Sequence, residues 1–275
     1  MKITAAEVNK LRKQTGAGMM DCKKALVEAE GDFDKAVDIL RKKGQKVAAK
    51  RSDRDASEGV VLAGQSSDGK HGAIIVLNCE TDFVAKNADF TGFAENILSI
   101  ALDNKPADLA ALKALPYGDG LSIDEKITEQ TGVIGEKIDL SSYDTVDAGS
   151  VVTYIHPGNK LASVVGLNKE GDFSEVGKDV AMQVAAMAPV ALDKDSVPQD
   201  VIEKEIEVGK DLAIQEGKPA DLAEKIAMGR LNKFFQENTL LNQAFIKDNK
   251  KSIKQYLSEA ESGLSVTSFK RFSLS

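Results

Sequence analysis

Residues 77–86 read LNCETDFVAK, and this stretch decides the fold because its pattern occurs twice in the chain. The apolar run 73–77 leads into it and is typical of a buried strand. A polar turn follows, and a helical pattern begins near Asp89. Asp82 and Phe83 therefore lie at a strand-to-helix corner on the surface, where binding residues are usually carried. The same pattern also fits a purely structural corner, in which Asp82 caps a helix and Phe83 packs onto the core.

The chain contains an internal repeat with an offset of 90 residues. The strand IIVLN at 74–78 matches VVGLN at 164–168, and the pair DF at 82–83 matches DF at 172–173. Each copy reads strand, polar turn, strand, corner and helix. The repeat predicts an α+β fold in which a β-hairpin-plus-helix core is duplicated and its sheets are antiparallel.

The N-terminal region reads as a small helical domain. Residues 4–43 fit three short helices, a minimal bundle close to the lower size limit of independent stability. Thr4 and Glu7 have the spacing of a capping box at the start of the first helix. The third helix is predicted to end near Gly44, and the charged, small residues 45–58 read as a linker, with a helical start of this segment as the alternative.

Two adjacent methionines, Met19 and Met20, lie where the first loop meets the second helix. Neighbours on a helix point about 100° apart, so both cannot enter one small core. We expect at least one to be exposed, where a flexible thioether suits contact with an apolar groove of a partner. The alternative is that a methionine fills a gap in the core.

An insertion follows the second copy of the repeat. Apolar spacing over 201–215 and 221–236, with the turn GKP between them, predicts an antiparallel helical hairpin. Such an arm serves self-association or partner contact, or it packs on the body, and the residues leave these alternatives open. We therefore predict an N-terminal three-helix domain with its linker (1–55), a first core subdomain (56–140), a second core subdomain (141–190 and 230–275) and the inserted arm (191–229).

Composition narrows the class of partner. The formal net charge of −7 argues against nucleic acid as the main partner. Residues 1–55 hold 14 Lys and Arg against 9 Asp and Glu, so a basic head precedes a body with 22 against 34. No apolar run approaches the roughly 18 residues of a membrane span. The N-terminus lacks the apolar core of a signal peptide, so the expected location is the cytoplasm.

The sequence shows no pattern for covalent or metal chemistry. Cys22 and Cys79 read as buried small hydrophobes. Neither His71 nor His156 has metal-ligand spacing, and no nucleophile or nucleotide-binding motif is present. His156 ends a strand just before a turn, on an expected exposed rim. These patterns predict a non-enzymatic protein with no metal and no cofactor.

Two strings resemble the signatures of one family. Residues 11–26, LRKQTGAGMMDCKKAL, are similar to the N-terminal signature of bacterial elongation factor Ts, and residues 77–86 are similar to its second signature. The resemblance covers nearly the whole chain. It implies an N-terminal bundle like a ubiquitin-associated domain. It also implies a guanine-nucleotide exchange factor, which binds elongation factor Tu in its GDP-bound and nucleotide-free forms and promotes GDP release.

The resemblance also implies roles for particular residues. The first set reaches the partner's GTPase domain, with the aromatic ring wedged near the magnesium and phosphate site: Thr81, Asp82, Phe83 and Val84. A second set belongs to the N-terminal-domain contact: Leu11, Met19, Met20 and Lys23. Ile138 and His156 match further contacts made by the core. The resemblance leaves a homodimer through the hairpin undecided, because members of the family differ in this respect.

Longer members of the family continue past the final strand into a C-terminal helical module, so we expect contacts through that module to be missing here. Two functions from other classes are the alternatives. One is a passive binding module that does not accelerate nucleotide release. The other is an enzyme that uses Asp82 with His156.

Overall fold

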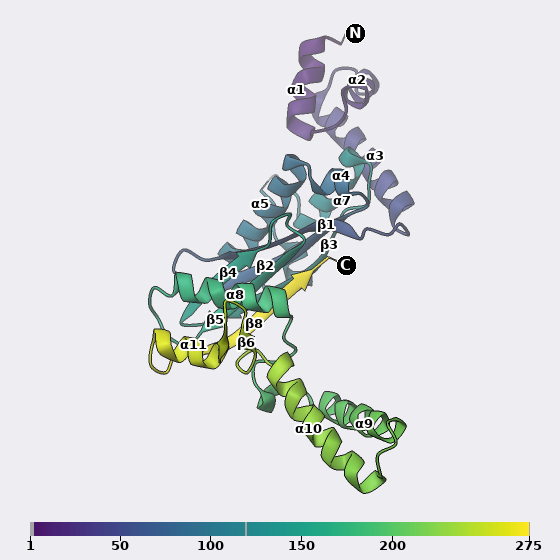
Figure 1. Cartoon of the computed structure of the whole chain (residues 1–275). Coiled ribbons are helices and arrows are strands. Elements are labelled where there is room, and N and C mark those ends of the chain that lie inside the picture. The colour runs from purple at the N-terminus through teal and green to yellow at the C-terminus, as the bar shows by residue number, and fades with distance from the viewer. Residues whose placement is uncertain (1–2, 119, 275) are drawn as a thin grey trace. The chain divides into compact units, whose positions relative to one another are not determined.

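Local sequence signals begin and end the helices of the computed structural model, which describes residues 3–118 and 120–274 (Figure 1). The predicted capping box is present at the first helix. Thr4 Oγ1 accepts from the Glu7 N–H at 3.3 Å, and the Thr4 N–H donates to Glu7 Oε2 at 2.7 Å. Gly16 follows this helix with a φ of +70°, a left-handed conformation that glycine adopts without strain. The predicted capping box therefore begins the first helix, and Gly16 ends it.

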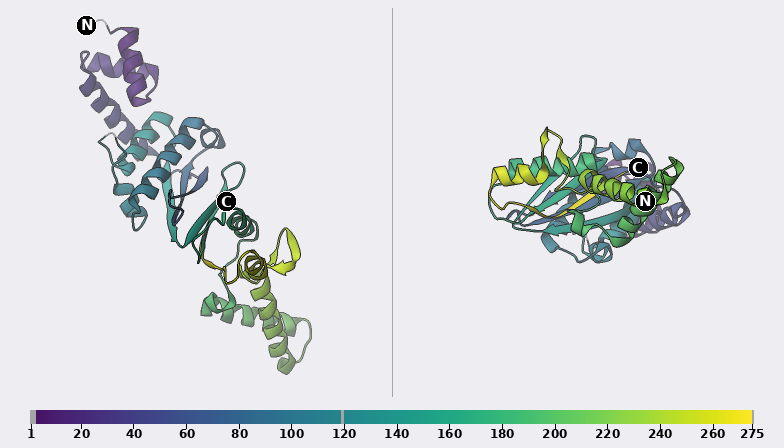
Figure 2. Two further views of the ribbon diagram at one scale, coloured as in Figure 1. Left: turned by 90° about the vertical axis from the view of Figure 1, so that its left-hand side faces the viewer. Right: turned by 60° about the horizontal axis from the view of Figure 1, so that its bottom comes forward.

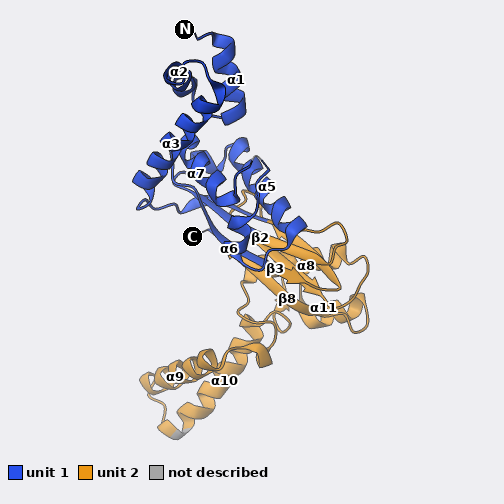
Figure 3. Ribbon diagram, turned by 180° about the vertical axis from the view of Figure 1, so that it is seen from behind, with its two compact units in different colours: residues 1–62, 75–144, 274–275 blue, residues 63–74, 145–273 orange. Residues whose placement is uncertain are grey.

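The chain forms two compact units (Figure 3). Within the described residues, unit 1 comprises 3–62, 75–118, 120–144 and 274, and unit 2 comprises Ala63–Ile74 and Thr145–Ser273. The chain passes from one unit to the other within three strands, which form a sheet in the order β1-β2-β3. These strands are β1 (Glu58–Gln65), β2 (His71–Cys79) and β3 (Asp139–Asp147). Every residue of β2 is buried, which confirms the buried strand predicted before the corner.

Unit 1 is mainly helical apart from these strands. Its helices are α1 (Ala5–Thr15), α2 (Met19–Glu28), α3 (Phe33–Arg51), α4 (Asp82–Ala85), α5 (Ala88–Asn104), α6 (Leu109–Ala114) and α7 (Ile123–Ile134). The first three pack around one apolar cluster that includes Leu11, Cys22 and Leu26. The bundle predicted from residues 4–43 is thus present as three helices.

The prediction that the third helix ends near Gly44 is wrong. Helix α3 continues to Arg51, so the linker is shorter than predicted. Gly44 is buried inside α3 where this helix packs against α7, and a Cβ on Gly132 of α7 would overlap the Gly44 backbone. Glycine is present here because two helix backbones approach closely, which offsets the roughly 1 kcal/mol that glycine costs inside a helix.

Unit 2 is built on a second sheet, in the order β4-β5-β8, whose neighbouring strands are antiparallel. The last strand of the chain, β8, closes this sheet by pairing with β5. Helix α8 covers the sheet, and their shared core includes Val165, Val184 and Leu257. The elements of unit 2 are β4 (Ser150–Ile155), β5 (Leu161–Leu167), α8 (Ser174–Met187), the 3-10 turn Lys194–Ser196, α9 (Gln199–Gln215), α10 (Ala220–Asn238), β6 (Ala244–Phe245), β7 (Asp248–Ser252), α11 (Ile253–Ala260) and β8 (Val266–Ser273).

The predicted helical hairpin is present as α9 and α10, which pack against each other and stand off the sheet of unit 2 (Figure 2). Small residues line the contact, and Gly209 lies against Ala227. Two ion pairs cross between the helices: Lys210 with Glu224 at 3.1 Å, and Arg230 with Glu216 at 2.7 Å.

The combination of helices with antiparallel sheets is the α+β class that the sequence predicted. Among residues 3–118 and 120–274, no helix has the length and low polarity needed to cross a bilayer. In the same residues, no three His, Cys, Asp or Glu side chains gather in a way that could hold a metal ion.

Candidate functional site

The corner after β2 presents a single aromatic side chain to solvent. Helix α4 is one turn long, and Phe83 is 83% exposed while Ala85 is buried on the opposite side. The structural alternative, in which Phe83 packs onto the core, is therefore wrong. The cap is also Thr81 rather than Asp82, because Thr81 Oγ1 accepts from the Val84 N–H at 3.4 Å. Asp82 instead forms an ion pair with Lys86 at 2.6 Å.

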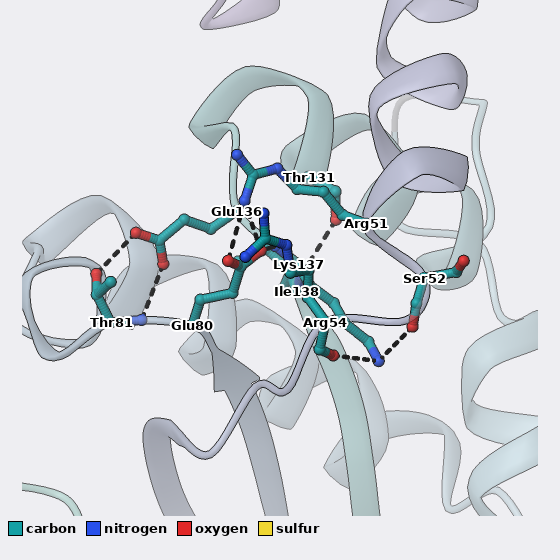
Figure 4. Close-up of polar contacts among 9 residues, drawn as sticks. All are labelled: Arg51, Ser52, Arg54, Glu80, Thr81, Thr131, Glu136, Lys137 and Ile138. Atoms are coloured by element: carbon teal, nitrogen blue, oxygen red, sulfur yellow. Dashed lines mark hydrogen bonds and ion pairs between the residues drawn. The ribbon is translucent and has the colours of Figure 1, made fainter.

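Thr81 anchors this turn to the body of unit 1 (Figure 4). Its N–H and its hydroxyl donate to the two carboxylate oxygens of Glu136, at 3.0 and 2.7 Å. Its carbonyl accepts from the Cys79 thiol at 3.2 Å. Burial raises the pKa of Cys79 to about 12, and the neighbouring Glu136 carboxylate adds to the effect, so this thiol stays protonated and available as a donor.

Glu80 ties the same corner to two other segments (Figure 4). Its carboxylate accepts from the Lys137 N–H at 2.6 Å and from Arg51 Nη1 at 2.8 and 2.9 Å. The Lys137 N–H, and then the Arg51 guanidinium, lower the pKa of Glu80 below its ordinary value. The Lys137 ammonium donates to the carbonyls of Ser52 and Arg54, at 2.8 and 3.0 Å. The corner, the end of α3 and the segment after α7 are therefore held together by charged hydrogen bonds.

An open hollow of about 560 Å³ adjoins the corner in unit 1. Val84 lines it beside Gly16 from the loop between α1 and α2. Tyr117 forms part of its wall, with its ring 5.4 Å from that of Phe93 and 5.6 Å from the Lys126 ammonium. The hollow offers a mixed apolar and cationic surface next to the exposed turn.

The N-terminal bundle presents a second exposed apolar surface. Met19 and Met20, at the start of α2, are 51% and 61% exposed, which confirms that they do not both fill the core. Lys23 is exposed on the same helix. Leu11 is completely buried in the bundle, so it supports this surface without being part of it.

The two core residues implied by the resemblance lie in different surroundings. His156 follows β4 in unit 2, is exposed, and has its Nδ1 2.9 Å from the Tyr154 hydroxyl. Ile138 in unit 1 is only 5% exposed, and its N–H donates to Thr131 Oγ1 at 3.2 Å. Its side chain therefore has almost no surface to offer a partner. The two residues before it, Glu136 and Lys137, make the contacts at the corner, and no sequence pattern indicated those contacts.

A family model and three relatives give the same family for this chain. The family model described as Elongation factor TS matches residues 80–275. The chain is 57% identical over 274 residues to a protein of Christiangramia forsetii named Elongation factor Ts, with 99% of each chain covered. A protein of the same name from Amoebophilus asiaticus is 56% identical over 273 residues, with 98% of each covered. A third, from Porphyromonas gingivalis, is 50% identical over 274 residues, covering 100% of this chain and 99% of its own.

Proposed function

Because the chain belongs to the elongation factor Ts family, we propose that it is a guanine-nucleotide exchange factor, which binds elongation factor Tu and promotes GDP release during translation elongation. The observation that supports this most directly is Phe83, an aromatic side chain 83% exposed on a turn that is fixed at its base. Burial of a solvent-exposed phenylalanine against a partner lowers the free energy of the complex. In this role the protein acts in the cytoplasm and uses no covalent chemistry, metal or cofactor of its own.

The proposed mechanism requires only a surface that fits the empty partner better than the nucleotide-bound one. Coupling is reciprocal, so a factor that weakens nucleotide binding is itself bound less tightly when nucleotide is present. A buried aromatic anchor carries roughly 2–4 kcal/mol of an interface. Since every 1.4 kcal/mol is about tenfold, insertion of Phe83 beside the partner's magnesium and phosphate site supplies about one and a half to three decades of exchange.

The other surfaces extend the contact. We assign Thr81, Asp82 and Val84 to the same contact as Phe83, since they form the turn that carries it. Met19, Met20 and Lys23 form a second contact through the N-terminal bundle, and His156 a third. Buried Leu11 and Ile138 act through the residues packed over them. The α9–α10 arm serves either self-association or partner contact.

Two finer features of the fold belong to the proposal. The first is that the α1–α3 bundle is of the ubiquitin-associated type. The second is that the body arose by duplication of one β-hairpin-plus-helix unit. The order strand, strand, corner, helix supports the duplication, since it occurs as β1, β2, α5 and again as β4, β5, α8.

The test is release of a fluorescent GDP analogue from elongation factor Tu, with this protein in catalytic amount. We expect faster release with the wild type and a loss of about a hundredfold in Phe83→Ala, by the anchor energy above. Val190→Ala is the control, because Val190 is another large apolar side chain, 54% exposed, and belongs to unit 2 rather than to this corner. Binding without faster release would instead favour a passive binding module, for which the exposed methionines of α2 would suffice.

A further inference from the structure

We propose that Glu136 is a positioning residue for Phe83: its carboxylate fixes the turn that presents the aromatic ring to the partner. This inference rests on the proposed exchange function. It adds a residue that neither signature contains and that lies 55 positions from Thr81 in sequence.

Every polar group of Thr81 has a partner. The N–H and the hydroxyl donate to Glu136, the hydroxyl oxygen accepts from the Val84 N–H, and the carbonyl accepts from the Cys79 thiol and the Ala85 N–H. Two donors bound to the two oxygens of one carboxylate fix both the position and the rotation of Thr81. The direction in which the next residues leave the strand is thereby set.

Helix α4 has little else to fix its orientation. It is a single turn, far below the length at which a helix is stable on its own. Phe83 contributes few packing contacts because it is largely exposed, and only Ala85 of this turn is buried. The orientation of the Phe83 side chain therefore depends on the residue that begins the turn, and that residue is held by Glu136.

The contacts are reciprocal between two segments (Figure 4). The Glu136 carboxylate accepts from the Thr81 N–H, and the Glu80 carboxylate accepts from the Lys137 N–H. Each segment thus supplies a side-chain acceptor to the backbone of the other. Gly135 places Glu136 for this contact, since it ends α7 with a φ of +82° and turns the chain toward the corner. A rigid turn loses less conformational entropy on binding, so it presents its side chain at higher affinity.

Glu136→Gln tests the proposal directly, since an amide nitrogen cannot accept a hydrogen bond from Thr81. Glu125→Gln is a matched control. Glu125 Oε2 accepts from both the N–H and the hydroxyl of Ser122, at 2.8 and 3.1 Å, so it also holds the residue before a helix, at the other end of α7, but through one oxygen.

We expect Glu136→Gln to slow stimulated GDP release by about tenfold, which corresponds to about 1.4 kcal/mol, while Glu125→Gln stays within about twofold of the wild type. Thermal unfolding of both variants reports the purely structural loss. In a Phe83→Ala background, Glu136→Gln should cause no further loss of release, because a positioning residue acts only through the group it positions. Its effect on unfolding should persist in that background.

A second readout follows the ring itself. Fluorine NMR of protein labelled with 4-fluorophenylalanine gives one signal for each of the ten Phe residues, and Phe83→Leu identifies the one from Phe83. That signal should shift in Glu136→Gln and stay unchanged in Glu125→Gln.

The proposal is overturned if Glu136→Gln releases GDP at the wild-type rate, if it loses no more than Glu125→Gln, or if its loss persists without Phe83. The proposed function fails separately, when the wild type itself does not stimulate release. In that case an unmoved Phe83 signal in Glu136→Gln also overturns the positional claim, and a shifted signal supports it.

Discussion

The same dipeptide, Asp-Phe, occurs at two matching corners of this chain, and its aromatic ring is exposed at one corner and packed on the core at the other. Phe83 is 83% exposed on α4 in unit 1. Phe173, 90 positions later, is partly buried and packs against the core of unit 2 at the start of α8. The pair itself therefore does not determine whether its aromatic ring is a contact residue or part of the core.

The residue before the pair accounts for the difference. Thr81 caps α4, and its N–H and hydroxyl bind Glu136. The matching residue is Gly171, with a φ of +151°, and a Cβ there would lie 3.0 Å from the Phe173 ring. Glycine lets the ring turn back over the backbone onto the core, whereas threonine begins an extra turn that carries its ring outward. This one position thus separates a corner with an exposed ring from a corner with a packed ring.

The largest expected effects are a loss of GDP release at the first corner and a loss of stability at the second. Phe83→Ala should reduce stimulated GDP release about a hundredfold with almost no change in unfolding temperature, since the ring is exposed. Phe173→Ala should destabilise unit 2 by about 1–3 kcal/mol, less than a fully buried Phe would, and leave release per folded molecule unchanged. Fluorescent GDP release and thermal unfolding of both variants measure this. Equal losses of GDP release in the two variants would show that the two corners do not differ in their contribution to exchange.

The sequence predicts the framework of both corners because the framework is local. Periodicity located β2, the capping box located α1, and the two methionines could not both enter a small core. The Asp-Phe pattern by itself did not predict the ring directions, since it fits both an exposed ring and a packed ring, and only the family resemblance implied that Phe83 faces outward. The length of α3 was missed because a glycine that permits close helix packing resembles one that ends a helix. Glu136 was missed because its contact with Thr81 spans 55 residues and leaves no periodic signal.

A smaller effect tests the role of glycine at the structural corner. Gly171→Thr introduces a β-branched residue at a strained φ and against the Phe173 ring, so we expect a loss of about 2 kcal/mol. Urea unfolding measures it. Gly69→Thr is the control, because Gly69 also has a positive φ of +66° but a Cβ there would meet nothing within 4 Å. If the two variants lose equal stability, backbone strain alone explains the glycine and the ring contact contributes nothing.

The pH dependence of stability should also differ between the two corners, because each has a carboxylate with a lowered pKa. The Lys137 N–H and Arg51 lower the pKa of Glu80 from its ordinary 4.5. A lowered folded pKa stabilises the protein above the unfolded value, and the contribution is lost as pH falls through the folded pKa. At the other corner, the Ser174 hydroxyl and N–H lower the pKa of Asp172 from 3.8, so its loss begins at a lower pH.

We therefore expect Glu80→Gln to reduce the decline in unfolding temperature that begins below pH 4.5, and Asp172→Asn to reduce the part that begins below pH 3.8. Thermal unfolding across this range measures both. An unchanged slope in Glu80→Gln would mean that the Arg51 and Lys137 contacts do not stabilise the folded state.

The smallest effect concerns the acid of each pair. Asp82 and Lys86 form an ion pair whose side chains are 44% and 74% exposed, and such pairs contribute about 0–1 kcal/mol. Asp82→Asn should therefore change stability by less than about 0.5 kcal/mol, as should Lys86→Gln, its control for loss of the same pair. If Asp82→Asn nevertheless slows GDP release while Lys86→Gln does not, the carboxylate acts on the partner rather than on its own turn.

Asp172, whose carboxylate accepts from the N–H and hydroxyl of Ser174 at the start of α8, should show the reverse: a small loss of stability in Asp172→Asn and unchanged release. If both acids slowed release equally, the second corner would also face the partner, and the difference between the corners would lie in the direction of their rings alone.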